Sequence, residues 1–167
     1  MKRSQCIVKL IFRVQFVCLQ QSQQYNKLGK LHLTTCFERD AKRLTITVIK
    51  AEDLPKYGLS GAPDPCVRIK VEQSGKVQTK STRTLKRTCN AVFKEAVMFL
   101  VVTHPVVLDS TKITISVVDT LHAFSPNEVI GEVLLGIHAR EKTEIDQWRQ
   151  TIEHPGKDIK AVHNLRV

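Results

Sequence analysis

The sequence lacks the residue patterns that support most enzymatic and metal chemistry. Its five cysteines are an odd number, are widely spaced and include no Cys-x-x-Cys pair, which argues against a disulfide framework and a zinc ribbon. No Gly-x-Ser-x-Gly, no phosphate-binding glycine loop and no His-Glu-x-x-His occurs, and these are common signatures of nucleophilic, nucleotide-dependent and zinc-dependent enzymes. We therefore expect reduced thiols and a protein that is not an enzyme.

Aromatic residues and long apolar runs are also scarce. Phe, Trp and Tyr make up 5% of the chain and do not interleave with its basic stretch, so the stacking surface typical of nucleic-acid binders is missing. The apolar residues 6–19 are interrupted by Lys9, Arg13 and Gln15, whereas a membrane span needs about 20 apolar residues. The sequence therefore favours neither nucleic-acid binding nor a transmembrane helix, and without a cleavage site it does not favour a signal peptide.

Positive charge is what the chain has in excess. Lys and Arg number 26 against 16 Asp and Glu, a formal net charge of +10. Half of this surplus lies in residues 1–28, which carry basic groups and no acid. An excess of this size favours an anionic partner, such as lipid headgroups or an acidic protein surface.

Residues 1–28 differ from the rest of the chain. Apolar residues occupy every second position from Cys6 to Cys18, which is the period of a strand, and residues 20–28 are Gln-rich and typical of a linker. Three interpretations stay open: a disordered or foreign extension, an extra strand or remnant of an upstream domain, and a membrane-associated anchor. We place this basic and apolar leader outside the fold and the domain at 29–167.

From residue 30 onward, short segments alternate apolar and polar residues and are separated by clusters of Gly, Pro, Asn and Asp. The alternating segments are 31–35, 44–48, 67–71, 96–102, 113–118, 129–135 and 159–165. Seven or eight short strands with turns between them predict an antiparallel sandwich.

One segment, 141–152, has helical spacing instead. Ile145, Trp148 and Ile152 fall at i, i+3 and i+7, which predicts an amphipathic helix. We expect Trp148 to anchor this helix to the sandwich.

Five strings, in chain order, resemble a known family. The first two strands of a C2 domain are matched by GKLHLTTCFERDAKRLTITVIKAEDLP, and the next loop and strand by GAPDPCVRIKV. The family's NPxFNExF strand is matched by TCNAVFKEAVMF, and its third loop by ISVVDTLHAFSPNEVIGEVLLG. The last helix and strand resemble those of the second C2 domain of synaptotagmins, in WRQTIEHPGKDIKAVHNL. The resemblance covers about residues 29–165.

The resemblance implies an all-β fold, an eight-stranded antiparallel C2-type β-sandwich with one short helix before the last strand. Three loops at one end would form the working face. It also implies a module that binds anionic phospholipids, such as phosphoinositides or phosphatidylserine, and SNARE or other trafficking proteins in vesicle exocytosis. The expected location is cytoplasmic and peripheral, on a vesicle or the plasma membrane.

Calcium-binding C2 domains place acidic residues on two loops, because calcium takes six to eight oxygen ligands. At the matching positions this chain has Asp64 and Asp119, with Glu128 as a third acid, whereas Gly58 and Leu121 have no side-chain oxygen. We therefore expect no tight calcium binding and no cofactor. Asp64 and Asp119 are then expected to organise the loop backbone.

The resemblance further implies a basic fourth strand that binds phosphoinositides and acidic proteins. The matching residues 76–87 carry the cations Lys76, Lys80, Arg83, Lys86 and Arg87. If they lie on one strand, the three lysines share a face and give weak, salt-sensitive binding to an anionic membrane. The alternative is a solvated edge strand whose lysines discourage aggregation.

Two further features bear on binding. Leu59 and Phe124 are expected at loop tips, where they either enter the headgroup region or pack within the loops. At the chain end, His163 and Leu165 match the final motif of the family. Where that motif has a Trp, this chain has Val162.

The sequence thus predicts a calcium-independent, synaptotagmin-like C2 module that binds anionic phospholipid or trafficking proteins. Two alternatives stay open: a protein-interaction scaffold without membrane affinity, and a weak calcium sensor that uses the three remaining acids.

Overall fold

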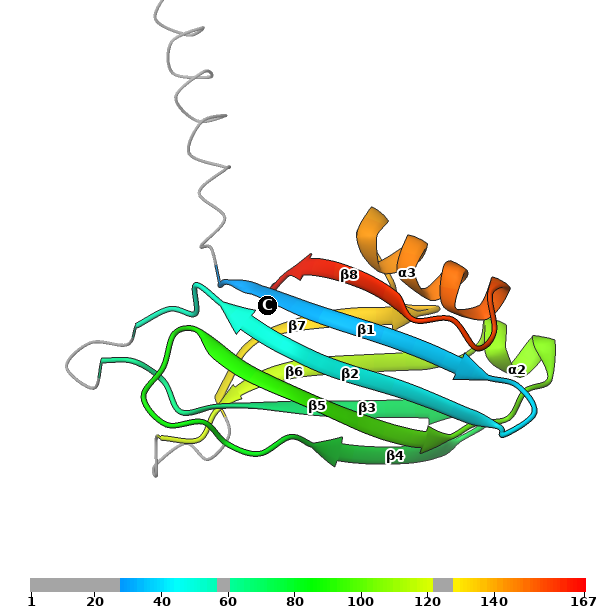
Figure 1. Cartoon of the computed structure of the whole chain (residues 1–167), viewed down its shortest axis with the longest axis horizontal. Coiled ribbons are helices and arrows are strands. Elements are labelled where there is room, and N and C mark those ends of the chain that lie inside the picture. The colour runs from blue at the N-terminus through cyan, green and yellow to red at the C-terminus, as the bar shows by residue number, and fades with distance from the viewer. Residues whose placement is uncertain (1–27, 57–60, 122–127) are drawn as a thin grey trace, which may run out of the picture.

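A computed structural model describes residues 28–56, 61–121 and 128–167, which form two four-stranded antiparallel sheets packed face to face (Figure 1). One sheet has the order β5-β2-β1-β8 and the other β4-β3-β6-β7. The strands are β1 (Lys30–Glu38), β2 (Arg43–Glu52), β3 (Pro65–Gln73), β4 (Lys76–Ser81), β5 (Ala91–Leu100), β6 (Lys112–Asp119), β7 (Glu128–Gly136) and β8 (Ile159–Asn164). The predicted eight-stranded sandwich is confirmed.

Two helices occur within the described ranges, α2 (Pro105–Asp109) and α3 (Lys142–Glu153). α2 begins at Pro105, where proline fits because its missing N–H would have no helical partner. α3 precedes the last strand, as predicted. Neither helix is long and apolar enough to cross a membrane.

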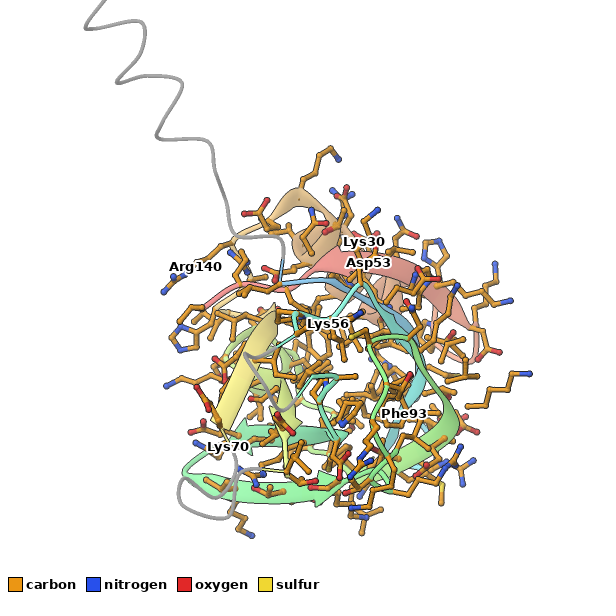
Figure 2. The ribbon with its side chains drawn as sticks, turned by 90° about the vertical axis from the view of Figure 1, so that its left-hand side faces the viewer. Lys30, Asp53, Lys56, Lys70, Phe93 and Arg140 are labelled. Atoms are coloured by element: carbon orange, nitrogen blue, oxygen red, sulfur yellow. The ribbon has the colours of Figure 1, made fainter. Side chains whose placement is uncertain are left out.

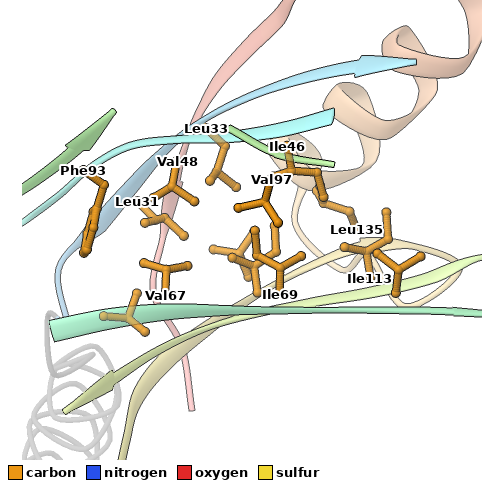
Figure 3. Packing of buried hydrophobic residues seen from close by; sticks show 14 of the residues in the cluster. Leu31, Leu33, Ile46, Val48, Val67, Ile69, Phe93, Val97, Ile113 and Leu135 are labelled. Carbon is orange, nitrogen blue, oxygen red and sulfur yellow. The ribbon is translucent and has the colours of Figure 1, made fainter. Parts of the chain in front are cut away.

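The core lies between the two sheets. Alternate residues of the strands point inward, so that Ile46 of β2, Ile69 of β3 and Ile113 of β6 are fully buried (Figure 3). Each such side chain stabilises the fold by about 1.5–3 kcal/mol relative to an exposed one. Leu28, the first described residue, also packs against this core.

The C-terminal segment closes one open side of the sandwich. After β8, the backbone of Arg166 exchanges two hydrogen bonds with Glu132 of β7, at 2.7 and 3.2 Å. This close approach requires glycine at position 131, because a Cβ there would lie 2.8 Å from Cβ of Leu165. The segment therefore ties the two sheets together on this side.

Side chains close the opposite side, where β4 and β5 are the edge strands. Gln78 Nε2 donates to the carbonyl oxygen of Leu100, and Lys80 Nζ donates to that of Met98, each at 2.6 Å. Two side chains of β4 thus take the place of backbone pairing between the two sheets.

The helix α3 docks through a different face from the one predicted. Trp148 and Ile152 pack half-buried against the core, as expected, but Ile145 is 47% exposed. The residues that α3 buries fully are polar, namely Glu144, Gln147 and Thr151. The apolar spacing missed this face because these groups are satisfied by hydrogen bonds from neighbouring strands and loops, which remove the cost of burying them.

Candidate functional site

The loops expected to bind ligands gather at the end of the sandwich where β2 and β6 end and β3 begins. Figure 2 views the molecule from this end and labels Asp53 and Lys56, which follow β2. Gly58 and the predicted loop tips Leu59 and Phe124 lie outside the described residues.

Asp64 lies at the start of β3 and is 3% exposed. One of its carboxylate oxygens accepts the backbone N–H of Arg87 at 2.7 Å, and the other accepts Lys86 Nζ at 2.9 Å. Burial alone would raise the pKa of Asp64, but the Arg87 N–H and the Lys86 ammonium outweigh burial and lower this pKa. The carboxylate is therefore held in its charged form by two donors of the chain itself.

Asp119, at the end of β6, accepts hydrogen bonds from the loop backbone, as expected. Its Oδ1 accepts the backbone N–H of Asp64 and that of Leu121, each at 2.9 Å. Glu128, the first residue of β7, is paired in register with Asp119 but is exposed to solvent. In the part of the chain that the structure describes, no three His, Cys, Asp or Glu side chains form a group that could hold a metal ion.

The predicted basic strand is shorter than expected. β4 ends at Ser81, so Lys86 does not share a strand face with Lys76 and Lys80. The segment 82–90 instead runs beside residues 63–67, with Leu85 N–H donating to the Pro65 carbonyl and Thr88 N–H to that of Pro63. These backbone hydrogen bonds place Lys86 and Arg87 at the end of the sandwich where the loops gather.

The lysines of β4 lie on the side of this strand that continues the inward face of β3. Lys80 pairs with Ile69 and Lys76 with Gln73, both on the inward face of β3. Cross-strand partners point to the same face, so Lys80 reaches across to the edge of β5. There its ammonium donates to the Met98 carbonyl and lies 5.5 Å from the centre of the Phe99 ring.

Arg83 is used within the fold. Its guanidinium donates to the Glu95 carboxylate at 2.6 Å and to the Phe93 carbonyl at 2.7 Å, and its backbone N–H also points to Glu95. It thereby fixes the segment after β4 to β5, beside Lys94, which has a positive φ of 51°. The Arg83 guanidinium therefore holds this segment in place and is not a free cation at the surface.

We call the five predicted cations, with Arg68 and Lys70, the basic strip. The strip follows β3, β4 and the segment after β4. Arg68 and Lys70 lie on the outward face of β3, between its buried residues, and Lys70 pairs with Glu72 at 2.8 Å. The alternation of apolar and basic residues in 67–71 already places Arg68 and Lys70 on an outward face. The resemblance to the basic fourth strand of the family concerns residues 76–87 alone.

A second polar cluster holds α3 against β7, β8 and the chain end. Glu144 is fully buried and accepts the backbone N–H groups of Leu134, Arg140 and Glu141, and its carboxylate pairs with the Arg166 guanidinium. Burial would raise the pKa of Glu144, but these donors lower it. The carboxylate is a buried, fully bonded anion.

His163 lies beneath α3 and is 1% exposed. Gln147 donates its amide N–H to the Ile159 carbonyl, which turns its oxygen toward His163 Nε2 at 2.6 Å. His163 Nε2 therefore donates, and Nδ1 accepts the Thr143 hydroxyl at 3.0 Å. Leu165 is also buried, whereas Val162, at the position of the family's Trp, is 44% exposed.

This environment predicts a stability loss in mild acid. Burial, as the main cause, lowers the pKa of His163, so the unfolded chain takes up a proton at higher pH than the folded one. The contribution of His163 is complete above the unfolded pKa of about 6.5 and is lost as the pH falls toward the folded pKa. Urea unfolding from pH 7.5 to 5.5 should show this loss, at about 1.4 kcal/mol for each unit of pKa depression.

The matched variants are His163→Gln and His138→Gln, since His138 is exposed. The first should flatten the pH dependence in this range and the second should preserve it. An unchanged slope in His163→Gln would contradict the assignment.

Comparison with known proteins gives one consistent family. Residues 42–151 match the family model described as the C2 domain. Rat synaptotagmin-9 is 35% identical over 139 residues, which are 83% of this chain and 28% of that protein. Human synaptotagmin-4 is 33% identical over 138 residues, 82% of this chain and 32% of that protein. The chain thus spans about a third or less of the length of these relatives.

Solved structures agree on the fold. The first C2 domain of human synaptotagmin XIII superposes with a TM-score of 0.61 at 18% identity, covering 86% of this chain and 90% of that one. The third C2 domain of the KIAA1228 protein gives 0.63 at 18% identity, with 84% and 89% covered. The two four-stranded sheets and the helix before the last strand agree with the family match over residues 42–151. The chain therefore belongs to the C2 domain family.

Proposed function

We propose that this C2 domain binds anionic phospholipid membranes through fixed positive charge, without calcium, as a peripheral module in membrane traffic. The pairing of Lys86 with Asp64 carries this proposal. In a calcium-dependent loop the ion neutralises the carboxylates and so draws the domain to anionic lipid. Here the ammonium of Lys86 and the backbone N–H of Arg87 supply that counter-charge to Asp64.

The basic strip supplies the attraction. The side chain of Lys86 is 76% exposed even while it contacts Asp64, and Lys76 and Arg87 are also exposed. Lys80 and Arg83 contribute less, since their donors are engaged by β5. At about 1 kcal/mol per basic group near an anionic surface, three such cations support weak and salt-sensitive binding.

Vesicle co-sedimentation tests this function. The protein should pellet with vesicles that contain phosphatidylserine or a phosphoinositide, and not with phosphatidylcholine alone, equally in calcium and in chelator. Lys76→Glu with Arg87→Glu should lower the apparent affinity by roughly tenfold or more, since each lost cation removes about 1 kcal/mol. Raised salt should have a similar effect.

The matched control is Arg140→Glu with Lys157→Glu, which changes the net charge equally before and after α3, where both residues are exposed. This control should bind like the unchanged protein. Pelleting that requires calcium would favour the calcium sensor, and no pelleting on any vesicle would favour the scaffold. Either result contradicts the proposal.

A further inference from the structure

Ser81 presents an exposed hydroxyl group in the middle of the basic strip. It is the last residue of β4, and its side chain makes no hydrogen bond to any described residue. Cations lie on both sides of it in the sequence, with Lys80 directly before it and Arg83 two residues after it. Such an acceptor suits a serine kinase whose substrate groove is acidic, because the groove attracts the flanking cations.

The next hydroxyl groups along the chain are less suited to modification. Thr82 is 7% exposed, and its hydroxyl is bonded to the β3 backbone. The hydroxyl of Thr88 is bonded to neighbouring backbone groups, and Thr84 is half-buried. Within residues 80–90, Ser81 therefore has the one hydroxyl that is both exposed and unbonded.

Arg68 lies opposite Ser81 and can hold a phosphate there. The two residues are cross-strand partners on the outward face, so their Cβ atoms are about 4.5–5.5 Å apart. Arg68 has no side-chain partner among the described residues, and a guanidinium binds phosphate through two parallel N–H···O bonds. Thr79, the other exposed hydroxyl on this face of β4, lies opposite Lys70, whose ammonium is already paired with Glu72 at 2.8 Å. The unpaired guanidinium therefore favours Ser81.

We propose that Ser81 is a phosphorylation site that lowers the membrane affinity of the basic strip. In the transfer, Oγ of Ser81 attacks the γ-phosphorus of ATP held by a kinase. A new O–P bond forms while the bond from the γ-phosphorus to the β–γ bridging oxygen breaks, the hydroxyl proton passes to the base of the kinase, and ADP leaves. The product carries about −1.5 to −2 charges at pH 7.

The phosphate opposes the basic strip in two ways. It pairs with Arg68, so that cation no longer attracts lipid, and it places negative charge between Lys80 and Arg83. Electrostatic binding to anionic lipid then weakens, as it does when other basic segments are phosphorylated. This loss of affinity rests on the proposed membrane function, whereas the modification and its pairing with Arg68 do not.

The first test treats the full chain with ATP and the catalytic fragment of protein kinase C, which selects basic residues around its acceptor. Tandem mass spectrometry should find phosphate on Ser81, and Ser81→Ala should remove it. Ser110→Ala is the control, since Ser110 is an exposed serine at the end of α2, and it should leave the phosphate in place. Phosphate on Thr79 or Thr84 instead, or no phosphate at all, would overturn the assignment of the site.

The second test uses the full chain produced with phosphoserine at position 81. Phosphorus NMR should show that the second pKa of the phosphate lies below its usual value of about 6, because the Arg68 guanidinium stabilises the dianion. Arg68→Gln should raise this pKa. Lys112→Gln should not, since Lys112 begins β6 and is not a cross-strand neighbour of Arg68. The same pKa in all three chains would contradict the pairing with Arg68.

The third test compares the phosphorylated and unmodified chains on phosphatidylserine vesicles. The chain phosphorylated at Ser81 should bind at least about tenfold more weakly, since the phosphate offsets about two cations of the strip. A chain phosphorylated at Ser110 should bind like the unmodified one. Equal pelleting of the Ser81-phosphorylated and unmodified chains would contradict the loss of affinity alone. An unmodified chain that does not pellet would contradict the membrane function and the loss of affinity together, while the first two tests still decide the site.

Discussion

Replacing Glu144 with alanine should lower the free energy of unfolding by about 3–5 kcal/mol, the cost of removing one partner from a buried ion pair. The Glu144 carboxylate accepts three backbone N–H groups and the Arg166 guanidinium. The variant leaves the three backbone N–H groups without this acceptor beneath α3, and the Arg166 guanidinium keeps only its contact with Glu141, at 3.4 Å. Urea denaturation at neutral pH measures the loss.

Glu153→Ala is the control for this change, because Glu153 lies on the same helix and is exposed. It should alter stability by less than about 0.5 kcal/mol, as surface substitutions usually do. A loss in Glu144→Ala no larger than in the control would contradict the role of the Glu144 carboxylate in holding α3.

Replacing Asp64 with alanine should have the second-largest effect, a loss of about 2–4 kcal/mol, because two hydrogen bonds to a charged carboxylate disappear. The variant should also weaken vesicle binding, since Asp64 holds the segment that carries Lys86 and Arg87. Asp64→Asn should lose less, because an amide oxygen can still accept the Arg87 N–H. Thermal unfolding and co-sedimentation of both variants, with and without calcium, measure these effects.

The pH dependence of this contribution follows from the lowered pKa of Asp64. The stabilisation is complete above the unfolded pKa of about 3.9 and is lost as the pH falls through the lower folded value. Asp53→Asn is the control, since Asp53 is exposed. A calcium-dependent rise in the stability of the unchanged protein, abolished in Asp64→Asn, would show that Asp64 is a calcium ligand and not the anchor of residues 86 and 87.

The strands could be predicted because their signal is local. An inward residue such as Ile69 alternates with an outward one such as Arg68, and β2 shows the same period over most of its length. The position of α3 was predictable for the same reason. The residues that it buries were not, because Glu144 and Gln147 owe their burial to Arg166 and His163, which become neighbours only in the fold.

The candidate site was predictable in its residues but not in their contacts. Asp64 and Lys86 are separated by 22 positions, and their meeting depends on the turn at Arg87, whose φ is 47°. The alternation of residues 76–87 places Lys76 and Lys80 on one face correctly. It does not reveal that this face turns toward β5, because that depends on which side of β3 is buried.

The pairing of β1 with β8 places the two ends of the domain side by side. Lys30, at the start of β1, is opposite Asn164, at the end of β8, and Glu52 lies opposite Lys30 on the other side. Polypeptide that precedes and polypeptide that follows the sandwich therefore leave it from the same corner. Such a unit can be inserted into a larger architecture, duplicated or excised with little disturbance to its hosts, as domains with neighbouring ends generally tolerate.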